Sequence, residues 1–186
     1  MDAESRNPNR AIPAVIKRSS LSPQNQGSFV VSLADAMSSS NFHEKVQNAE
    51  RDYRNAVSRW AGHVSRIEKN RSDTLLRWRL ADDIATFRRH LRFKWGIVPT
   101  NIVLAASIDL GVSYSSLKYM LCLRERFTLK EVGLGKITWA RYQEILDIKD
   151  DNLMRECVNL VRTGQVTSPR GIREFKKKAN SLHRKG

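Results

Sequence analysis

Residues 105–121 read AASIDLGVSYSSLKYML, and this stretch decides the fold that the sequence predicts. A helix-turn-helix needs small residues where its two helices cross, a glycine where the turn requires positive φ, and apolar residues on both inner faces. Ala106 and Ser107 are small, and Gly111 follows four residues after Ser107. Apolar residues flank the glycine and continue along the second helix: Leu110, Val112, Leu117, Met120 and Leu121. The pattern therefore predicts two helices joined at Gly111.

The outer face of the predicted second helix carries hydroxyl groups, a lysine and two tyrosines. Short hydroxyl side chains at a helix N-terminus can bind phosphates or base edges, helped by the positive end of the helix dipole. Two structural alternatives stay open, with Ser113 as an N-cap and Tyr114 as a packed residue at the rim. The residues that we expect to meet the major groove of double-stranded DNA are Ser113, Tyr114, Ser115, Lys118 and Tyr119.

The charge of the chain favours nucleic acid as a partner. The 186 residues include 33 Lys and Arg against 19 Asp and Glu, a formal net charge of +14. Such an excess attracts polyanions, of which nucleic acid is the commonest and an anionic membrane or an acidic protein are the others. The basic residues from Arg170 to the C-terminus have an alternative interpretation, a solvated and frayed terminus. The residues that we expect to hold phosphates are Arg124, Arg126, Arg170, Arg173, Lys176, Lys177 and Lys178, with Arg184 and Lys185 in the tail.

Two longer helices are predicted before this segment. Apolar residues at three- and four-residue spacing mark one face of each helix, and Gly96 is a natural stop for the second. The pattern predicts a helical hairpin over residues 41–96. A coiled coil, and with it a homodimer through residues 42–67, would give the same stripe. The apolar positions are Val46, Ala49, Tyr53, Ala56, Trp60, Val64 and Ile67 on the first helix, and Leu76, Leu80, Ile84, Phe87, Leu91 and Trp95 on the second.

The remaining segments complete an all-α prediction, a helical hairpin followed by a multi-helix helix-turn-helix domain. Residues 1–27 are rich in Ser, Asn, Pro and Gln, and residues 1–40 are expected to form a flexible N-terminal arm. Within them, the apolar run 28–33 fits a strand, a docking segment or the start of a helix. Residues 97–186 are expected to form the helix-turn-helix DNA-binding domain with a basic C-terminal helix. Short helices are predicted over 101–110, 113–125, 138–147, 151–163 and 169–182.

The order of features from Asn101 to Lys178 resembles the helix-turn-helix region of ParB-type partition proteins and related plasmid regulators. The matching segments are 110–117 (LGVSYSSL), 121–124 (LCLR), 135–138 (GKIT), 139–146 (WARYQEIL), the acidic break 149–151, and 164–175 (GQVTSPRGIREF). The resemblance implies a DNA-reading module. The N-terminal half contains nothing like the family's nucleotide-binding domain, so neither CTP binding nor a sliding clamp is carried over.

Residue types that perform catalysis or bind metals do not form a recognisable site. The four histidines are scattered, and the adjacent Asp82 and Asp83 point in different directions on a helix. Residues 133–136 (GLGK) lack the full spacing of a phosphate-binding loop. We therefore expect no enzyme, no metal and no cofactor. No apolar run approaches the ~20 residues that span a bilayer, and we expect a cytoplasmic protein, associated with nucleoid or plasmid.

The sequence thus predicts a sequence-specific double-stranded DNA-binding protein, acting as a partition factor or a transcriptional regulator. Two alternatives stay open. One is a helical protein that binds RNA or single strands through the basic and aromatic residues of 77–94, although Trp78 and Phe93 are expected more often in a core. The other is an assembly adaptor whose 42–67 stripe pairs with another protein.

Overall fold

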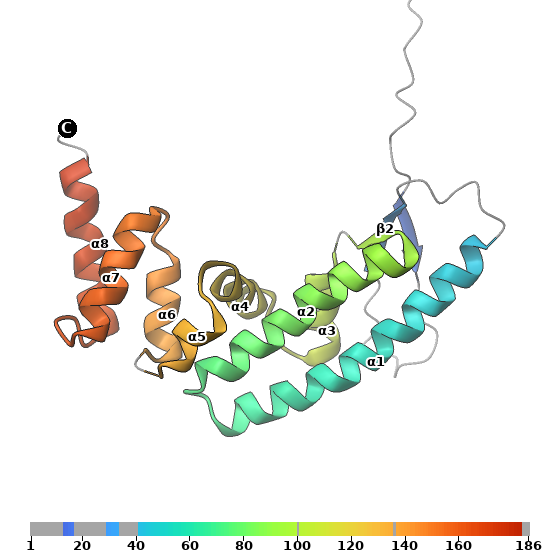
Figure 1. The fold of residues 1–186 in the computed structure, drawn as a ribbon, viewed down its shortest axis with the longest axis horizontal. Coiled ribbons are helices and arrows are strands. Elements are labelled where there is room, and N and C mark those ends of the chain that lie inside the picture. Colours follow the sequence, from blue (N-terminus) through green and yellow to red (C-terminus); the bar gives the residue numbers. More distant parts are fainter. Residues whose placement is uncertain (1–12, 17–28, 34–40, 100, 136, 184–186) are drawn as a thin grey trace, which may run out of the picture. The chain divides into compact units, whose positions relative to one another are not determined.

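The computed structural model describes residues 13–16, 29–33, 41–99, 101–135 and 137–183 (Figure 1). Three short strands are present, β1 (Pro13–Ile16), β2 (Phe29–Leu33) and β3 (Ile97–Pro99). The helices of these residues are α1 (Phe42–Lys69), α2 (Thr74–Trp95), α3 (Ile102–Leu110), α4 (Tyr114–Arg126), α5 (Leu129–Gly133), α6 (Trp139–Leu146), α7 (Asp151–Arg162) and α8 (Pro169–His183).

The predicted helical fold class is confirmed, since helices make up most of the described chain. The five short helices expected after residue 100 correspond to α3, α4, α6, α7 and α8, with ends that agree within one residue. The residues that end these helices explain why the predicted and observed bounds agree. Gly111 follows α3 with φ +64° and Gly164 follows α7 with φ +78°, conformations that favour glycine. The short α5 was not predicted, because five residues are too few to show a helical period.

Three short strands accompany the helices of this fold. They form an antiparallel sheet in the order β1–β2–β3, with Leu33 opposite Ile97 and Val31 opposite Pro99. Segments of three to five residues are too short for an alternation of period two to stand out. The expected N-terminal arm, residues 1–40, otherwise lies outside the described residues, as do Arg184 and Lys185 of the predicted tail.

The chain divides into two compact units. The N-terminal unit comprises residues 1–62 and 83–117, and the C-terminal unit comprises residues 63–82 and 118–186. Helices α1, α2 and α4 contribute residues to both units. The segments predicted from the sequence, 1–40, 41–96 and 97–186, are each continuous in the chain. Their boundaries therefore differ from those of the two units.

Aromatic side chains hold α1 against α2 in the N-terminal unit. The ring of Phe87 on α2 lies 5.8 Å from that of Tyr53 and 5.5 Å from that of Trp60, both on α1. The Trp60–Phe87 pair is edge to face, and a pair of this kind contributes about 0.5–1.5 kcal/mol beyond the area that it buries. Ala49 and Ala56 are as fully buried as the two α1 aromatics, so the predicted stripe is the inner face of this helix.

The core of the C-terminal unit lies among α4, α6, α7 and α8. Phe127 and Tyr142 pack edge to face with ring centroids 5.1 Å apart, and the indole N–H of Trp78 donates to the carbonyl of Phe127 over 2.7 Å. Further buried residues of this core come from every one of these helices, including Leu123, Ile145, Cys157, Val158 and Ile172. The half-buried side chain of Trp78 therefore packs against this core.

Two glycines give a test in which backbone conformation alone decides whether a substitution by alanine raises or lowers the free energy of unfolding. A Cβ would meet nothing within 4 Å at either Gly62, inside α1, or Gly111, at φ +64°. We expect Gly62→Ala to raise the free energy of unfolding by about 0.5–1 kcal/mol, because alanine restricts the unfolded chain and suits a helix. Gly111→Ala should lower it by about 1 kcal/mol, because an L side chain is strained at positive φ. Urea unfolding followed by circular dichroism measures both, and equal signs would contradict the assignment.

Candidate nucleic-acid interface

The turn between α3 and α4 is built as the sequence predicted. The backbone N–H of Val112 donates to the carbonyl of Ser107 over 3.1 Å, and that of Gly111 donates to Ile108 over 3.3 Å. With Gly111 left-handed, this is a Schellman motif that satisfies the last carbonyls of α3. The hydroxyl of Ser107 bonds back to the carbonyl of Leu104 over 2.8 Å. The turn is thus fixed locally, while its use on DNA remains a prediction.

The first turn of α4 presents hydroxyl groups, one of which is a cap. The hydroxyl oxygen of Ser113 accepts the N–H of Ser116 over 3.2 Å and lies 2.8 Å from the hydroxyl of Ser116. Ser113 therefore fills the N-cap role that the sequence left open. Ser115 and Tyr114 are exposed, and Leu117 turns fully inward. Of the predicted reading residues here, Tyr114 and Ser115 face solvent.

The next predicted reading residues differ from each other. Lys118 is exposed. Tyr119 is half-buried, and its hydroxyl donates to a carboxylate oxygen of Asp147 over 2.6 Å. This hydrogen bond, with burial and the nearby negative charge, raises the pKa of Tyr119. Tyr119 therefore joins α4 to the end of α6, and its phenol already has an internal partner.

Arg124 and Arg126 bind groups of the protein itself. The side chain of Arg124 lies 2.9 Å from the carboxylate of Asp82. Arg126 donates to the carbonyls of Leu146 and Ile148 over 3.2 and 2.8 Å, and it pairs with Asp151 at 2.5 Å. These bonds hold the carbonyls that follow α6, where the helix no longer satisfies them. Arg126 therefore has a structural role, and its expected phosphate contact stays a prediction.

Helix α8 has a basic outer face. Ser168 caps the helix by accepting the N–H of Gly171 over 3.1 Å, and Pro169 occupies its first position, as predicted. Ile172 and Ala179 are buried on its inner side. At 100° per residue, Arg170, Arg173 and Lys177 lie opposite, and these side chains are exposed together with Lys178.

The cations of α8 are compensated to different degrees. Lys176 is only 21% exposed, and its ammonium lies 3.2 Å from Glu144 and 3.5 Å from Asp147. Lys176 is therefore held by two carboxylates, and its expected phosphate contact stays a prediction. Arg173 lies 3.4 Å from Glu144 but remains 60% exposed, and Arg170 pairs with Glu174 one turn away at 3.1 Å. Exposed pairs contribute little, so a phosphate can replace these carboxylates.

Positive charge is concentrated in the C-terminal unit. Its residues include 21 Lys and Arg against 11 Asp and Glu, a formal net charge of +10. The N-terminal unit has 12 Lys and Arg against 8 Asp and Glu, a net charge of +4. The electrostatic attraction of a polyanion is therefore strongest for the C-terminal unit.

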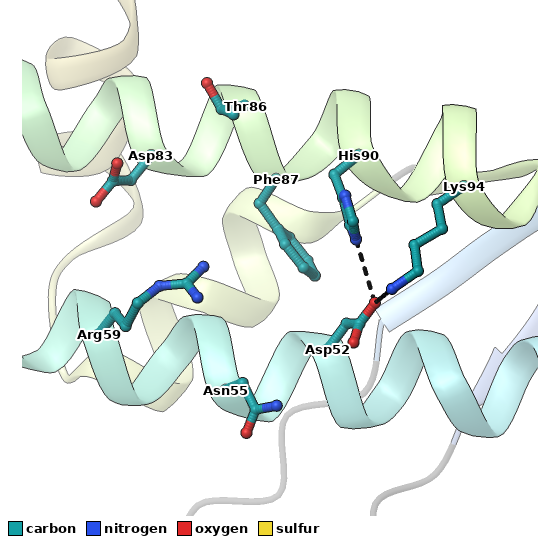
Figure 2. Close-up of a pocket in the computed structure, with 8 residues that line it drawn as sticks. All are labelled: Asp52, Asn55, Arg59, Asp83, Thr86, Phe87, His90 and Lys94. Carbon is teal, nitrogen blue, oxygen red and sulfur yellow. Dashed lines mark hydrogen bonds and ion pairs between the residues drawn. The ribbon is translucent and has the colours of Figure 1, made fainter.

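A pocket of about 350 Å³ lies between α1 and α2 in the N-terminal unit (Figure 2). Figure 2 shows the side chains of His90 and Lys94 reaching from α2 toward Asp52 on α1. One carboxylate oxygen of Asp52 lies 3.0 Å from the Lys94 ammonium, 3.2 Å from His90 and 3.0 Å from the Trp95 indole N–H. Burial alone would raise the pKa of Asp52, but hydrogen bonds from Trp95, Lys94 and His90 outweigh it and lower the pKa to about 2.

The Asp52 cluster is a polar clamp between two helices. Sequence reasoning missed it, because its members stand about 40 positions apart and no local spacing links Asp52 to His90, Lys94 or Trp95. The only sequence signal for this cluster came from the apolar stripes, because they predicted which faces of α1 and α2 would meet. The residues that the structure describes contain no group of three metal-ligating side chains and no helix that meets the length and hydropathy of a membrane span.

Asp52→Asn tests the clamp. The pKa of Asp52 is lower in the folded chain than its ordinary 3.8, so its charge stabilises the fold above pH about 4 and this contribution is lost as pH falls toward 2. We expect the substitution to lower the free energy of unfolding by about 1–2 kcal/mol at pH 7. The gap to the unmodified protein should narrow below pH about 4. Glu68→Gln, at an exposed position of α1, is the control and should change stability by less than about 0.5 kcal/mol. A gap that is constant with pH would contradict the role of the charge.

Comparison of the chain with protein-family models, curated proteins and solved structures found no match, so the resemblance to ParB-type proteins remains a prediction.

Proposed function

We propose that this protein binds double-stranded DNA, with the outer face of α8 as its phosphate-contacting element. The observation that carries the proposal is the row of exposed cations Arg170, Arg173 and Lys177 on one side of a helix whose other side is buried. The row belongs to a unit with a net charge of +10. Lysine and arginine side chains at such positions bind phosphates and release counterions, which provides sequence-independent affinity.

Sequence preference would come from the exposed side of α4. Ser115, Tyr114 and Lys118 follow the Schellman turn at Gly111 and project from the beginning of a 13-residue helix. The N-terminal residues of a recognition helix are those that reach base edges in a helix-turn-helix. Ser113 and Tyr119 contribute structurally, as cap and as partner of Asp147. The proposed class remains a partition factor or transcriptional regulator, associated with nucleoid or plasmid.

The structure gives less support to the alternatives considered from sequence. An adaptor or homodimer built on residues 42–67 requires an exposed apolar stripe, whereas Tyr53, Ala56 and Trp60 are fully buried within the single chain. A single-strand-binding surface that uses Trp78 has less support, because this side chain is half-buried against the C-terminal core and its indole N–H is bonded to Phe127. Homodimer formation through residues 42–67 stays a prediction, and no exposed apolar stripe on these residues supports it.

Salt-dependent anisotropy with random-sequence duplexes tests the phosphate role of α8. The double variant Arg170→Gln/Lys177→Gln should weaken binding and reduce the slope of log K against log salt by about 1.8, because each phosphate contact contributes about 0.9. Lys130→Gln removes an exposed cation from α5 in the same unit and should leave the slope nearly unchanged. Absence of duplex binding at low salt would overturn the proposal, and an unchanged slope in the double variant would remove α8 from it.

The reading role of α4 is tested on a DNA site selected from a random library. Ser115→Ala/Lys118→Ala should abolish most of the preference for the selected site over random duplex, because each lost base contact removes about 1–3 kcal/mol of discrimination. The affinity for random duplex should fall only by the amount expected from the loss of one cation, Lys118. An equal loss on both duplexes would show that α4 only contributes charge.

A further inference from the structure

The outer side of α2 in the N-terminal unit carries an exposed aromatic ring among arginines. Phe93 is 84% exposed, the most exposed large apolar residue found in the described chain. Arg89 lies one helical turn before it, and Arg88 lies one turn before Arg92, so all four residues share one side of α2. The opposite side buries Ile84, Phe87 and Leu91. We call these four residues, Arg88, Arg89, Arg92 and Phe93, the Arg88–Phe93 face.

Among the described residues, no carboxylate pairs with the arginines of this face. The sequence contains neither Asp nor Glu from residue 84 to residue 108. Within the described chain, Arg89 bonds to the hydroxyl of Thr86 over 3.1 Å, and none of the three arginines forms an ion pair. The nearby carboxylate of Asp52 is already engaged by Lys94, His90 and Trp95. This face therefore differs from α8, where Arg170 and Arg173 each have a carboxylate neighbour.

The combination of groups defines the chemistry of a partner. A lone exposed phenylalanine is ordinary on a protein surface and needs no explanation. Beside it lie three exposed guanidinium groups that form no ion pair within the described chain, and a guanidinium binds a phosphate with two parallel hydrogen bonds. An aromatic ring gains from stacking on a base, and a base offers its face only when it is unstacked from its neighbours. A single strand supplies both groups, whereas a closed duplex supplies phosphates alone.

We propose that the Arg88–Phe93 face binds single-stranded nucleic acid, with Phe93 stacking on an unpaired base and the arginines holding the adjacent phosphates. This surface belongs to the N-terminal unit, and the proposal does not depend on the duplex-binding role of α8. It replaces the wider surface that the sequence suggested over residues 77–94, because Trp78 is half-buried against the C-terminal core and Lys94 is paired with Asp52.

The experiment uses the full chain and a fluorescently labelled oligothymidine of about 16 nucleotides, beside a duplex of the same length. Phe93→Leu should weaken binding of the single strand about fivefold or more, while duplex affinity changes less than about twofold, because stacking contributes about 1–3 kcal/mol per base. Phe93→Trp keeps a stacking ring and should retain the affinity. Arg88→Gln/Arg89→Gln/Arg92→Gln should reduce the salt slope on the single strand by about 2, at about 0.7 per contact.

Two controls match these changes in kind. Arg54→Gln removes an arginine of the same unit whose guanidinium is paired with Glu50, and Leu134→Ala removes another exposed apolar side chain. Neither should change single-strand affinity by more than about twofold. The proposal is overturned if the oligothymidine does not bind, if Phe93→Leu weakens single strand and duplex alike, or if Phe93→Trp fails to bind. It is also overturned if Phe93→Leu dissociates an oligomer in sedimentation, which would identify a self-association face. Duplex affinity and its dependence on Arg170 and Lys177 report separately on α8.

Discussion

The excess of positive charge is the constraint on which the rest of this structure depends. A C-terminal unit with a net charge of +10 must fold against its own repulsion. It does so by directing part of its cations inward onto oxygen atoms. Arg126 bonds to the carbonyls beyond α6, Arg162 to the carbonyl of Glu131, and Arg155 to its carboxylate. Such charge-assisted bonds satisfy helix ends that would otherwise need water. Other cations, such as Arg170 and Lys177, remain exposed on the outer face of α8, and this division separates structural residues from candidate binding residues.

Elements with strong local signals could be predicted from the sequence. The stripe containing Ala49, Tyr53, Ala56 and Trp60 is buried as expected, because a helix with one apolar face has few ways to pack. Helix ends could be located for an equally local reason, since Gly111, Gly164 and Ser168 fix the backbone or cap it directly. The strands could not, because their pairing joins residues such as Leu33 and Ile97 that no local pattern connects.

The candidate site was harder to predict, because charge type is visible in a sequence and pairing is not. Lys176 and Lys177 are neighbours of identical type, yet one pairs with Glu144 and Asp147 while the other faces solvent. Successive helix residues are rotated by 100°, so the two lysines point in different directions. Which of them meets a carboxylate depends on where α6 packs, and the sequence alone does not give that position. The reverse holds for Phe93, which was expected in a core because apolar residues usually lie there. The rotation of α2 that buries Phe87 and Leu91 leaves Phe93 outside.

The division of the chain into two units has a consequence for how the protein can be dissected. The chain passes between the units at residues 62–63, 82–83 and 117–118, and these positions lie inside α1, α2 and α4. Modular proteins usually join their units through exposed loops, which proteases cut and which tolerate insertion or permutation. Here every point of exchange has its backbone amides committed to a helix. Separating the units would interrupt three helices, so neither unit can be excised by cutting loops alone.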